Sequence, residues 1–110
     1  MIIKKAKDCP LKDADFVDGS LIENISYRKM AAGEKMLSTV TYYKKGAVLS
    51  MHKHRREEIG YIASGKIKLT SNNEEEVLEK GDTYAIIEKV EHEIEALEDS
   101  EIVTFFAPVE

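Results

Sequence analysis

Two histidines and a glutamate lie close together in the middle of the chain. One residue separates His52 from His54, and Glu58 follows four residues after His54. On a β-strand, successive side chains point to opposite faces, so residues two apart share a face. If this stretch is extended, both imidazoles therefore face the same way, and Glu58 has the same parity. Imidazole nitrogens and a carboxylate oxygen together suit a divalent first-row transition metal.

The third histidine of the chain lies much later, at position 92. It begins an alternating stretch in which Ile94 and Ala96 share its parity and glutamates occupy the positions between. The glutamates favour water, so His92 is expected to face the interior. All three histidines thus belong to one candidate set, and clusters of this kind in a cavity are typical of functional sites. The predicted metal ligands are His52, His54, Glu58 and His92.

The elements that must position these residues are short strands. Apolar residues recur at period two, in runs broken by glycine, asparagine or aspartate, and no helix of ordinary length is indicated. Residues 71–74 are a hairpin turn by composition. Short strands at regular spacing are typical of an all-β sandwich or barrel. The expected strands are 2–7 (an edge strand), 22–30, 36–43, 47–54, 58–63, 66–70, 75–78, 83–87, 92–97 and 102–106, with a loop over 8–20.

Length and charge limit the kind of protein this is. The 110 residues are expected to form one domain, 1–110, with residues 1–20 as an N-terminal arm and loop. The net charge is −5 and the basic residues are scattered, which argues against binding to nucleic acid or to an anionic membrane. No stretch reads as a signal peptide or a membrane span. Cys9 is the single cysteine, so no intrachain disulfide is possible and a cytoplasmic protein is predicted.

The spacing around the first two histidines resembles the first motif of the cupin superfamily. That motif reads Gly, five residues, His, one residue, His, three or four residues, Glu, six residues, Gly. The chain fills every position, with Gly46, His52, His54, Glu58 and Gly65. Glu57 is an alternative carboxylate, but parity and the step of six residues to the closing glycine both favour Glu58.

The second cupin motif is matched in part. Its opening glycine and its histidine correspond to Gly81 and His92, and fifteen residues separate the two motifs, as in compact members of the superfamily. The family's proline, glycine and asparagine positions hold Ile87, Lys89 and Ala96 in this chain. In the family, the proline and glycine shape the turn before the last ligand, and the asparagine is not a metal ligand. The resemblance spans residues 46–92.

The resemblance implies a small antiparallel jelly-roll β-barrel with little or no helix, holding one divalent transition metal: Mn, Fe, Ni or Zn. Four protein ligands around a six-coordinate ion would leave two positions open, which is typical of catalytic metal sites. A small oxygen-rich ligand (a sugar, hydroxy acid or keto acid) could bind there for Lewis-acid or, with iron, O₂ chemistry. The family contains isomerases, lyases and dioxygenases, so the fold does not choose the reaction. The alternative is a non-catalytic module that binds or senses a small molecule through the same metal pocket.

Residues beside the ligands are candidates for proton transfer or substrate binding. By parity these are Ser50 and Arg56, with Tyr84 and Ile86 on an adjoining strand. Arg56 suits a substrate carboxylate at the mouth of the barrel, although a solvated loop residue is its more ordinary interpretation. An enzyme should carry a proton-handling group within reach of the metal, whereas a sensor needs only a pocket with an opening.

A homodimer is the expected assembly. A short chain has little core, and antiparallel sheets leave edges that can pair with another chain. Compact cupins resemble this layout and commonly pair as twofold dimers. The outward glutamates of residues 91–95 disfavour an interface there, so we expect the interface on the other sheet or through the N-terminal arm, residues 1–7.

Overall fold

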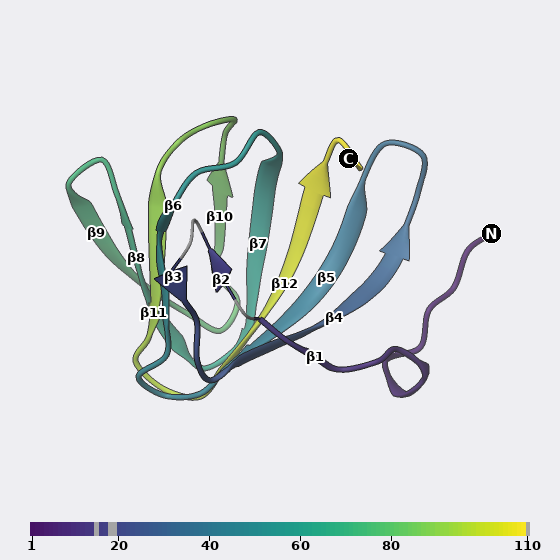
Figure 1. The fold of residues 1–110 in the computed structure, drawn as a ribbon, viewed down its shortest axis with the longest axis horizontal. Helices are drawn as coiled ribbons and strands as arrows, with labels where there is room; N and C mark the ends of the chain where they lie inside the picture. Colours follow the sequence, from purple (N-terminus) through teal and green to yellow (C-terminus); the bar gives the residue numbers. More distant parts are fainter. Residues whose placement is uncertain (15, 18–19, 110) are drawn as a thin grey trace.

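The structure is a computed structural model that describes residues 1–14, 16–17 and 20–109. These residues are mostly strands and the turns between them (Figure 1). A short 3₁₀ helix, η1 (Ala6–Asp8), comes first. None of the helices in the described part is long and apolar enough to cross a membrane. The strands are β1 (Lys12–Asp13), β2 (Phe16–Val17), β3 (Ser20–Leu21), β4 (Ile25–Ala32), β5 (Leu37–Tyr43), β6 (Val48–His52), β7 (Glu57–Ser64), β8 (Lys66–Ser71), β9 (Glu74–Glu79), β10 (Thr83–Ile86), β11 (His92–Ala96) and β12 (Ser100–Ala107).

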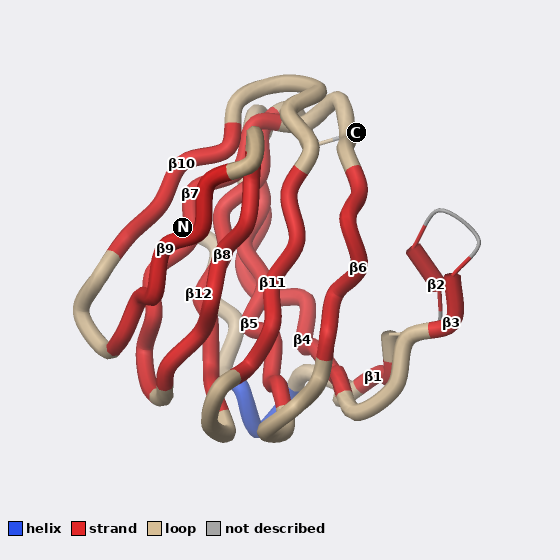
Figure 2. The backbone as a smooth tube through the Cα atoms, turned by 90° about the vertical axis from the view of Figure 1, so that its left-hand side faces the viewer, coloured by secondary structure: helices blue, strands red, loops and turns tan. Residues whose placement is uncertain are grey.

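Two antiparallel sheets dominate the fold. The larger sheet has the strand order β1-β4-β5-β12-β7-β10, the smaller has the order β6-β11-β8-β9, and β2 pairs with β3 alone. The two large sheets face each other in Figure 1, and Figure 2 shows the smaller sheet in front of the larger. The prediction of an all-β, antiparallel, cupin-like fold with little helix is confirmed.

The hydrophobic core lies between the two sheets and draws side chains from both. The larger sheet contributes Ile25, Ile62 and Ile102, and the smaller sheet contributes Ile67 and Ile94. The last four of these are at most 1% exposed. Branched side chains pack well on a pleated surface, and full burial of one stabilises the fold by about 1.5–3 kcal/mol. This layer of isoleucines holds the sheets together next to the candidate site.

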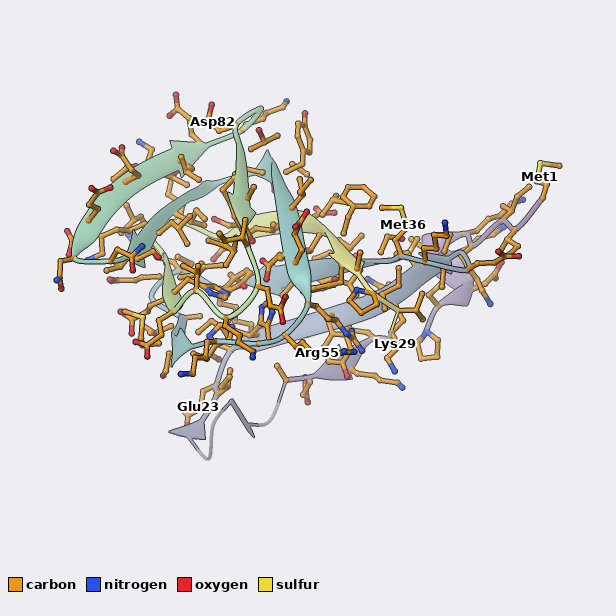
Figure 3. All side chains as sticks on the ribbon, turned by 90° about the horizontal axis from the view of Figure 1, so that it is seen from above. Met1, Glu23, Lys29, Met36, Arg55 and Asp82 are labelled. Carbon is orange, nitrogen blue, oxygen red and sulfur yellow. The ribbon has the colours of Figure 1, made fainter. Side chains whose placement is uncertain are left out.

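The N-terminal segment does not form the edge strand predicted for residues 2–7. Residues 1–5 pair with no strand, residues 6–8 form η1, and β1 first joins the larger sheet at Lys12–Asp13, inside the predicted loop. Figure 3 shows Met1 at the far end of an arm that extends away from the sheets. An alternating apolar pattern becomes a strand only where a sheet edge offers hydrogen bonds. Beside β4, that edge is taken in part by β1.

Asparagine and glycine shape the turns next to the smaller sheet. Asn72 and Asn73 connect β8 to β9 with φ angles of 52° and 64°, the values that a tight hairpin turn requires. The hairpin predicted at residues 71–74 is therefore confirmed. Gly65 connects β7 to β8 with a φ of 85°, and a Cβ at this position would overlap Asp99 and Ser100. Only glycine combines this backbone conformation with so close an approach to the start of β12.

Candidate metal centre

The three histidines lie where two loops, residues 53–56 and 87–91, pass from one sheet to the other, near the top of Figure 1. His52 ends β6 and His92 begins β11, and their Cα atoms are partners in the antiparallel register. His54 lies in the loop after β6, because that strand ends two residues earlier than predicted. The inward parity predicted for β11 is confirmed, since His92, Ile94 and Ala96 are all buried.

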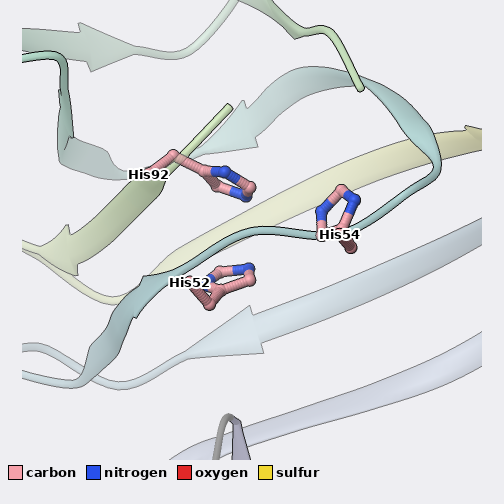
Figure 4. Close-up of side chains that lie close together, drawn as sticks. All are labelled: His52, His54 and His92. Carbon is pink, nitrogen blue, oxygen red and sulfur yellow. The ribbon is translucent and has the colours of Figure 1, made fainter. Parts of the chain in front are cut away.

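The side chains of these histidines converge on one point. Their candidate ligand atoms all lie within 4.8 Å of one another. The ring of His92 is 4.2 Å from that of His52 and 5.0 Å from that of His54, measured between centroids. Figure 4 shows that the three rings come from separate segments of the chain and lie around a common space. Residues forty positions apart in the sequence are thus brought together by the β6–β11 pairing.

Each imidazole is held by a backbone carbonyl two residues away. The pairs, with the distance from Nδ1 to the carbonyl oxygen, are His52–Ser50 (2.7 Å), His54–Arg56 (2.8 Å) and His92–Val90 (2.9 Å). A carbonyl oxygen can only accept a hydrogen bond, so Nδ1 must carry the proton and donate it. In a neutral ring this leaves the lone pair on Nε2. The same use of the second ring nitrogen orients metal-bound histidines in proteins generally.

Glu58, at the start of β7, brings a carboxylate to the same place. Its Oε1 lies 3.0 Å from Nε2 of His54 and 3.6 Å from Nε2 of His92. Its Oε2 accepts a hydrogen bond of 2.5 Å from the hydroxyl of Tyr84. The residue is only 5% exposed. One oxygen therefore faces the imidazoles, and the other faces the phenol.

The electrostatics of the site favour an ionised carboxylate. Burial alone would raise the pKa of Glu58, but the neighbouring His54, His92 and Tyr84 outweigh burial and hold that pKa at about 2. The hydrogen bond to Glu58 raises the pKa of His54, whereas burial lowers the pKa of His52. Burial and the charge of Glu58 raise the pKa of Tyr84 well above its usual value, so the phenol remains a donor. A negative charge therefore faces imidazole nitrogens, with Glu58 and His92 buried and His54 partly exposed.

The Nε2 atom of His92 is buried and has no hydrogen-bond partner among the residues that the structure describes. Glu58 Oε1, at 3.6 Å, is beyond hydrogen-bonding distance. Such an unsatisfied group costs about 1–3 kcal/mol. Donor atoms that share one ion at about 2.1 Å lie roughly 3 Å apart when they are adjacent. The donor types, their spacing and the missing partner of His92 all fit a bound metal ion.

A small cavity of about 180 Å³ opens beside the cluster. His52, His54 and Glu58 line part of it. Most of the other polar groups in the lining are hydroxyls, from Tyr27, Tyr43, Tyr84, Thr41 and Thr104. A larger cavity of about 730 Å³ lies at the opposite end of the sheets, and no histidine lines it.

Of the residues predicted to lie beside the ligands, Tyr84 lines the cavity and the others do not. Ile86 is buried in the core. A β-bulge in β6 shifts the register, so Leu49 rather than Ser50 lines the cavity, and Ser50 contributes only its carbonyl oxygen. The guanidinium carbon of Arg56 stands 5.9 Å from the ring centre of Phe106.

Several lining residues were missed by the sequence reasoning, among them Thr104 and Tyr43. Thr104 lies on β12, where Ser100, Ile102 and Thr104 are all buried and alternate with partly exposed residues. The sequence does not show this alternation, because the outward Val103 and Phe105 are more apolar than the buried Thr104. Tyr43 is buried at the end of β5, and only the packing of β4 and β5 brings it to the cavity. No local signal distinguishes it from the neighbouring Tyr42.

The sequence and the fold were compared with known proteins. The sequence pattern of the cupin domain matches residues 39–108. An uncharacterized protein of Methanocaldococcus jannaschii is 35% identical over 79 residues, which are 71% of this chain and 63% of the relative. The chain thus spans less than two thirds of the length of that relative. The match to the cupin domain covers more than half of this chain.

Solved structures share the fold across almost the whole chain. KdgF from Halomonas sp. superposes with a TM-score of 0.87 at 22% identity, covering 99% of this chain and 96% of that one. An RmlC-like cupin from Shewanella frigidimarina gives 0.86 at 16% identity, covering 98% and 91%. A predicted oxalate decarboxylase from Thermotoga maritima gives 0.82 at 17% identity, covering 99% and 100%. These identities show the common fold alone. The match to the cupin domain over residues 39–108 shows that this chain belongs to the cupin family.

Proposed function

We propose that this cupin binds one divalent transition metal through His52, His54, Glu58 and His92. The observation that carries the proposal is the Nε2 atom of His92. This atom is buried beside two other imidazoles and has no hydrogen-bond partner in the described part of the chain. A metal ion would satisfy this atom and would also neutralise the charge of Glu58. The candidate ions are Mn, Fe, Ni and Zn, because nitrogen and oxygen donors suit each of them.

We propose further that the metal serves a reaction on a small oxygen-rich molecule, such as a sugar, a hydroxy acid or a keto acid. The bound ion would supply Lewis-acid or O₂ chemistry. The cavity holds on the order of six water molecules at ~30 Å³ each, so the ligand must be small. Its hydroxyl-rich lining suits a ligand that presents oxygens. One structural relative is described as a predicted oxalate decarboxylase, and a small carboxylic acid agrees with this size.

A non-catalytic binding or sensing module is the second candidate. One observation favours it: the ionisable groups of the described cavity lining, apart from the proposed ligands, are the phenols of Tyr27, Tyr43 and Tyr84. Burial raises the pKa of both Tyr43 and Tyr84, which makes these phenols weak acids at neutral pH. An enzyme of this design would therefore rely on the metal, or on a ligand that leaves it, for proton transfer.

Ligand titrations of the metal-loaded protein separate the two candidates. Small hydroxy acids, keto acids, dicarboxylates and sugars would be screened by their effect on the melting temperature, and each one that binds would be followed by NMR for conversion. Conversion that is abolished by a chelator supports the enzyme. A ligand that binds only to the metal-loaded protein and stays unchanged, with and without O₂, supports the sensing module. If no ligand discriminates between loaded and metal-free protein, both candidates are wrong.

We also propose that two copies of the chain pair through the outer face of the larger sheet. Ile59 and Tyr61 on β7 and Phe105 on β12 are 47%, 41% and 38% exposed on that face, and Phe105 lies directly opposite Ile59. The outer face of the smaller sheet also exposes Val48 and Val77, but between them it carries charges, including the ion pair of Lys68 and Glu95 at 3.3 Å. A second copy would cover the apolar face, as symmetric dimers do.

The N-terminal arm can extend such an interface. Met1, Ile2 and Ile3 are exposed. Among the described residues, β1 pairs with Ser26 and Tyr27 of β4 and with no other residue of that edge. Light scattering should give about twice the chain mass of 12.4 kDa. Phe105→Lys should shift the mass towards the monomer, whereas Val77→Lys on the other sheet should not. A wild-type mass of one chain would contradict the pairing. A cytoplasmic location, a single domain and the absence of nucleic-acid or membrane partners remain predictions.

A further inference from the structure

The side chains of Glu58 and Tyr84 contact each other from neighbouring strands of the larger sheet. Strands β7 and β10 are antiparallel, with Tyr84 opposite Gly60 and Ile86 opposite Glu58. Tyr84 is 9% exposed and Glu58 is 5% exposed, so their contact is shielded from water. The hydroxyl donates to Oε2 over 2.5 Å, within the range of strong hydrogen bonds to a carboxylate. The strand register therefore fixes the phenol against one particular oxygen.

Gly60 makes room for this arrangement. A Cβ at position 60 would overlap the ring edge and the hydroxyl of Tyr84. The φ angle of Gly60 is not in the left-handed region, so its backbone conformation does not require glycine. The position requires glycine because the phenol lies directly against the β7 backbone, with its hydroxyl pointing at Glu58. Gly60 and Tyr84 thus act as one structural unit.

The two oxygens of Glu58 consequently have different surroundings. Oε1 is 3.0 Å from Nε2 of His54, and Oε2 is occupied by the hydroxyl of Tyr84. A carboxylate with both oxygens free can hold an ion through two atoms, which takes two coordination positions. We propose that Tyr84 is a positioning residue that restricts Glu58 to one metal contact, through Oε1. This inference rests on the proposed metal site.

The restriction has a functional consequence at the metal. With three imidazoles and one carboxylate oxygen as ligands, a six-coordinate ion keeps two positions for a ligand with two oxygens. If Oε2 also coordinated, only one position would remain, and such a ligand could no longer chelate. Tyr84 would therefore determine how a substrate binds without touching the ion itself.

Cobalt(II) alone is the probe that tests this role. Crystal structures of the cobalt-loaded wild type and the Tyr84→Phe variant would be compared, and cobalt affinities would be measured by competition with a chelator. We expect the wild type to coordinate through Oε1 only, with Oε2 on the Tyr84 hydroxyl. In Tyr84→Phe, which keeps the ring and its packing, we expect Oε2 to be free to approach the ion. We expect the affinity to fall by roughly 10- to 100-fold nonetheless, because the carboxylate is no longer held in its binding orientation before the ion arrives.

Two further variants separate positioning from general damage. Gly60→Ala keeps the hydroxyl but displaces the ring, so it should weaken cobalt binding in the same direction. Tyr61→Phe removes a hydroxyl from the outward face of β7 and should leave binding unchanged. If both oxygens of Glu58 coordinate cobalt in the wild type, the proposed role of Tyr84 is wrong and the metal site stands. The same holds if Tyr84→Phe has unchanged coordination and affinity. If the wild type binds no cobalt, the metal site and the inference both fail.

Discussion

The two sheets contribute unlike halves of the candidate site. The smaller sheet and the loop after β6 supply the imidazole nitrogens of His52, His54 and His92, which we call the nitrogen half. The larger sheet supplies the oxygens of Glu58 on β7 and Tyr84 on β10, which we call the oxygen half. In the nitrogen half, the buried Nε2 atom of His92 has no hydrogen-bond partner within the described residues. In the oxygen half, the carboxylate and the phenol satisfy each other.

The difference suggests that the two halves have different roles in metal binding. The nitrogen half creates the demand for a cation, because unsatisfied imidazole lone pairs in a buried place are costly. The oxygen half controls geometry, because the hydrogen bond from Tyr84 fixes how the carboxylate can turn. Both halves are held by the same layer of core isoleucines between the sheets. Changes in the nitrogen half should therefore affect whether metal binds, and changes in the oxygen half should affect how it binds.

The largest effect is expected in the nitrogen half, from His92→Ala. No nearby residue can replace the lost nitrogen, so metal affinity should fall by more than the roughly 100-fold that changes outside the ligand shell cause. Calorimetric titration with each candidate ion would measure the loss. Replacement of a partly exposed residue on the same strand, Glu95→Ala, is the matched control and should have little effect. Near-normal binding by His92→Ala would contradict the division into two halves.

Glu58→Gln should give a smaller loss of affinity. The amide keeps the shape of the side chain and an oxygen that can accept from Tyr84, but it removes the negative charge. We expect metal to bind more weakly than to the wild type and more tightly than to His92→Ala, in the same titration. If Glu58→Gln lost more affinity than His92→Ala, the oxygen half would be the main source of binding.

The pH dependence of metal binding should reveal the contact between the halves. The hydrogen bond to Glu58 raises the pKa of His54, and a protonated imidazole cannot bind metal. Affinity should therefore fall as pH drops, and the fall should begin above the usual histidine value of about 6.5. In Glu58→Gln the same fall should begin at lower pH. Affinity measurements between about pH 5 and 9 would check this, and identical profiles in the two proteins would disprove the coupling.

The smallest expected effect is on thermal stability. Metal that binds the folded chain and not the unfolded one adds about 2.7 kcal/mol at a free concentration 100 times Kd. Chelator should therefore lower the melting temperature of the loaded wild type at neutral pH. This effect of chelator should fade as pH falls, beginning above about pH 6.5, because the pKa of His54 is raised and protons then compete for the imidazoles. The melting temperature of His92→Ala should not change when chelator is added. If the melting temperature of the wild type is also unchanged by chelator, the folded chain does not hold metal.

The sequence identifies the nitrogen half better than the oxygen half. Residue type and spacing select His52, His54 and His92, and the alternation of β11 correctly places His92 inside. The contact of Glu58 with Tyr84 depends on the register between β7 and β10, which no local pattern specifies. The need for Gly60 arises from the same register. Pairing over long sequence distances is thus the information that local reasoning lacks.

Strand boundaries failed where the pairing of strands overrides local pattern. The apolar residues Ile2 and Ile3 suggested an edge strand, yet they pair with no strand of the described chain. In β6, the bulge between the pairs at His52 and Leu49 changes the parity, so Ser50 does not line the cavity as expected. Both differences come from interactions with other strands, whereas the hairpin at Asn72–Asn73 was predictable because its turn is local.

The central claim is that the four side chains of His52, His54, Glu58 and His92 hold one metal ion. Elemental analysis after separate loading with Mn, Fe, Ni and Zn, followed by removal of free ions, tests it most directly. The account predicts about one equivalent per chain for at least one ion in the wild type, and loss of that ion in His92→Ala. Less than about a tenth of an equivalent for every ion in the wild type would contradict it.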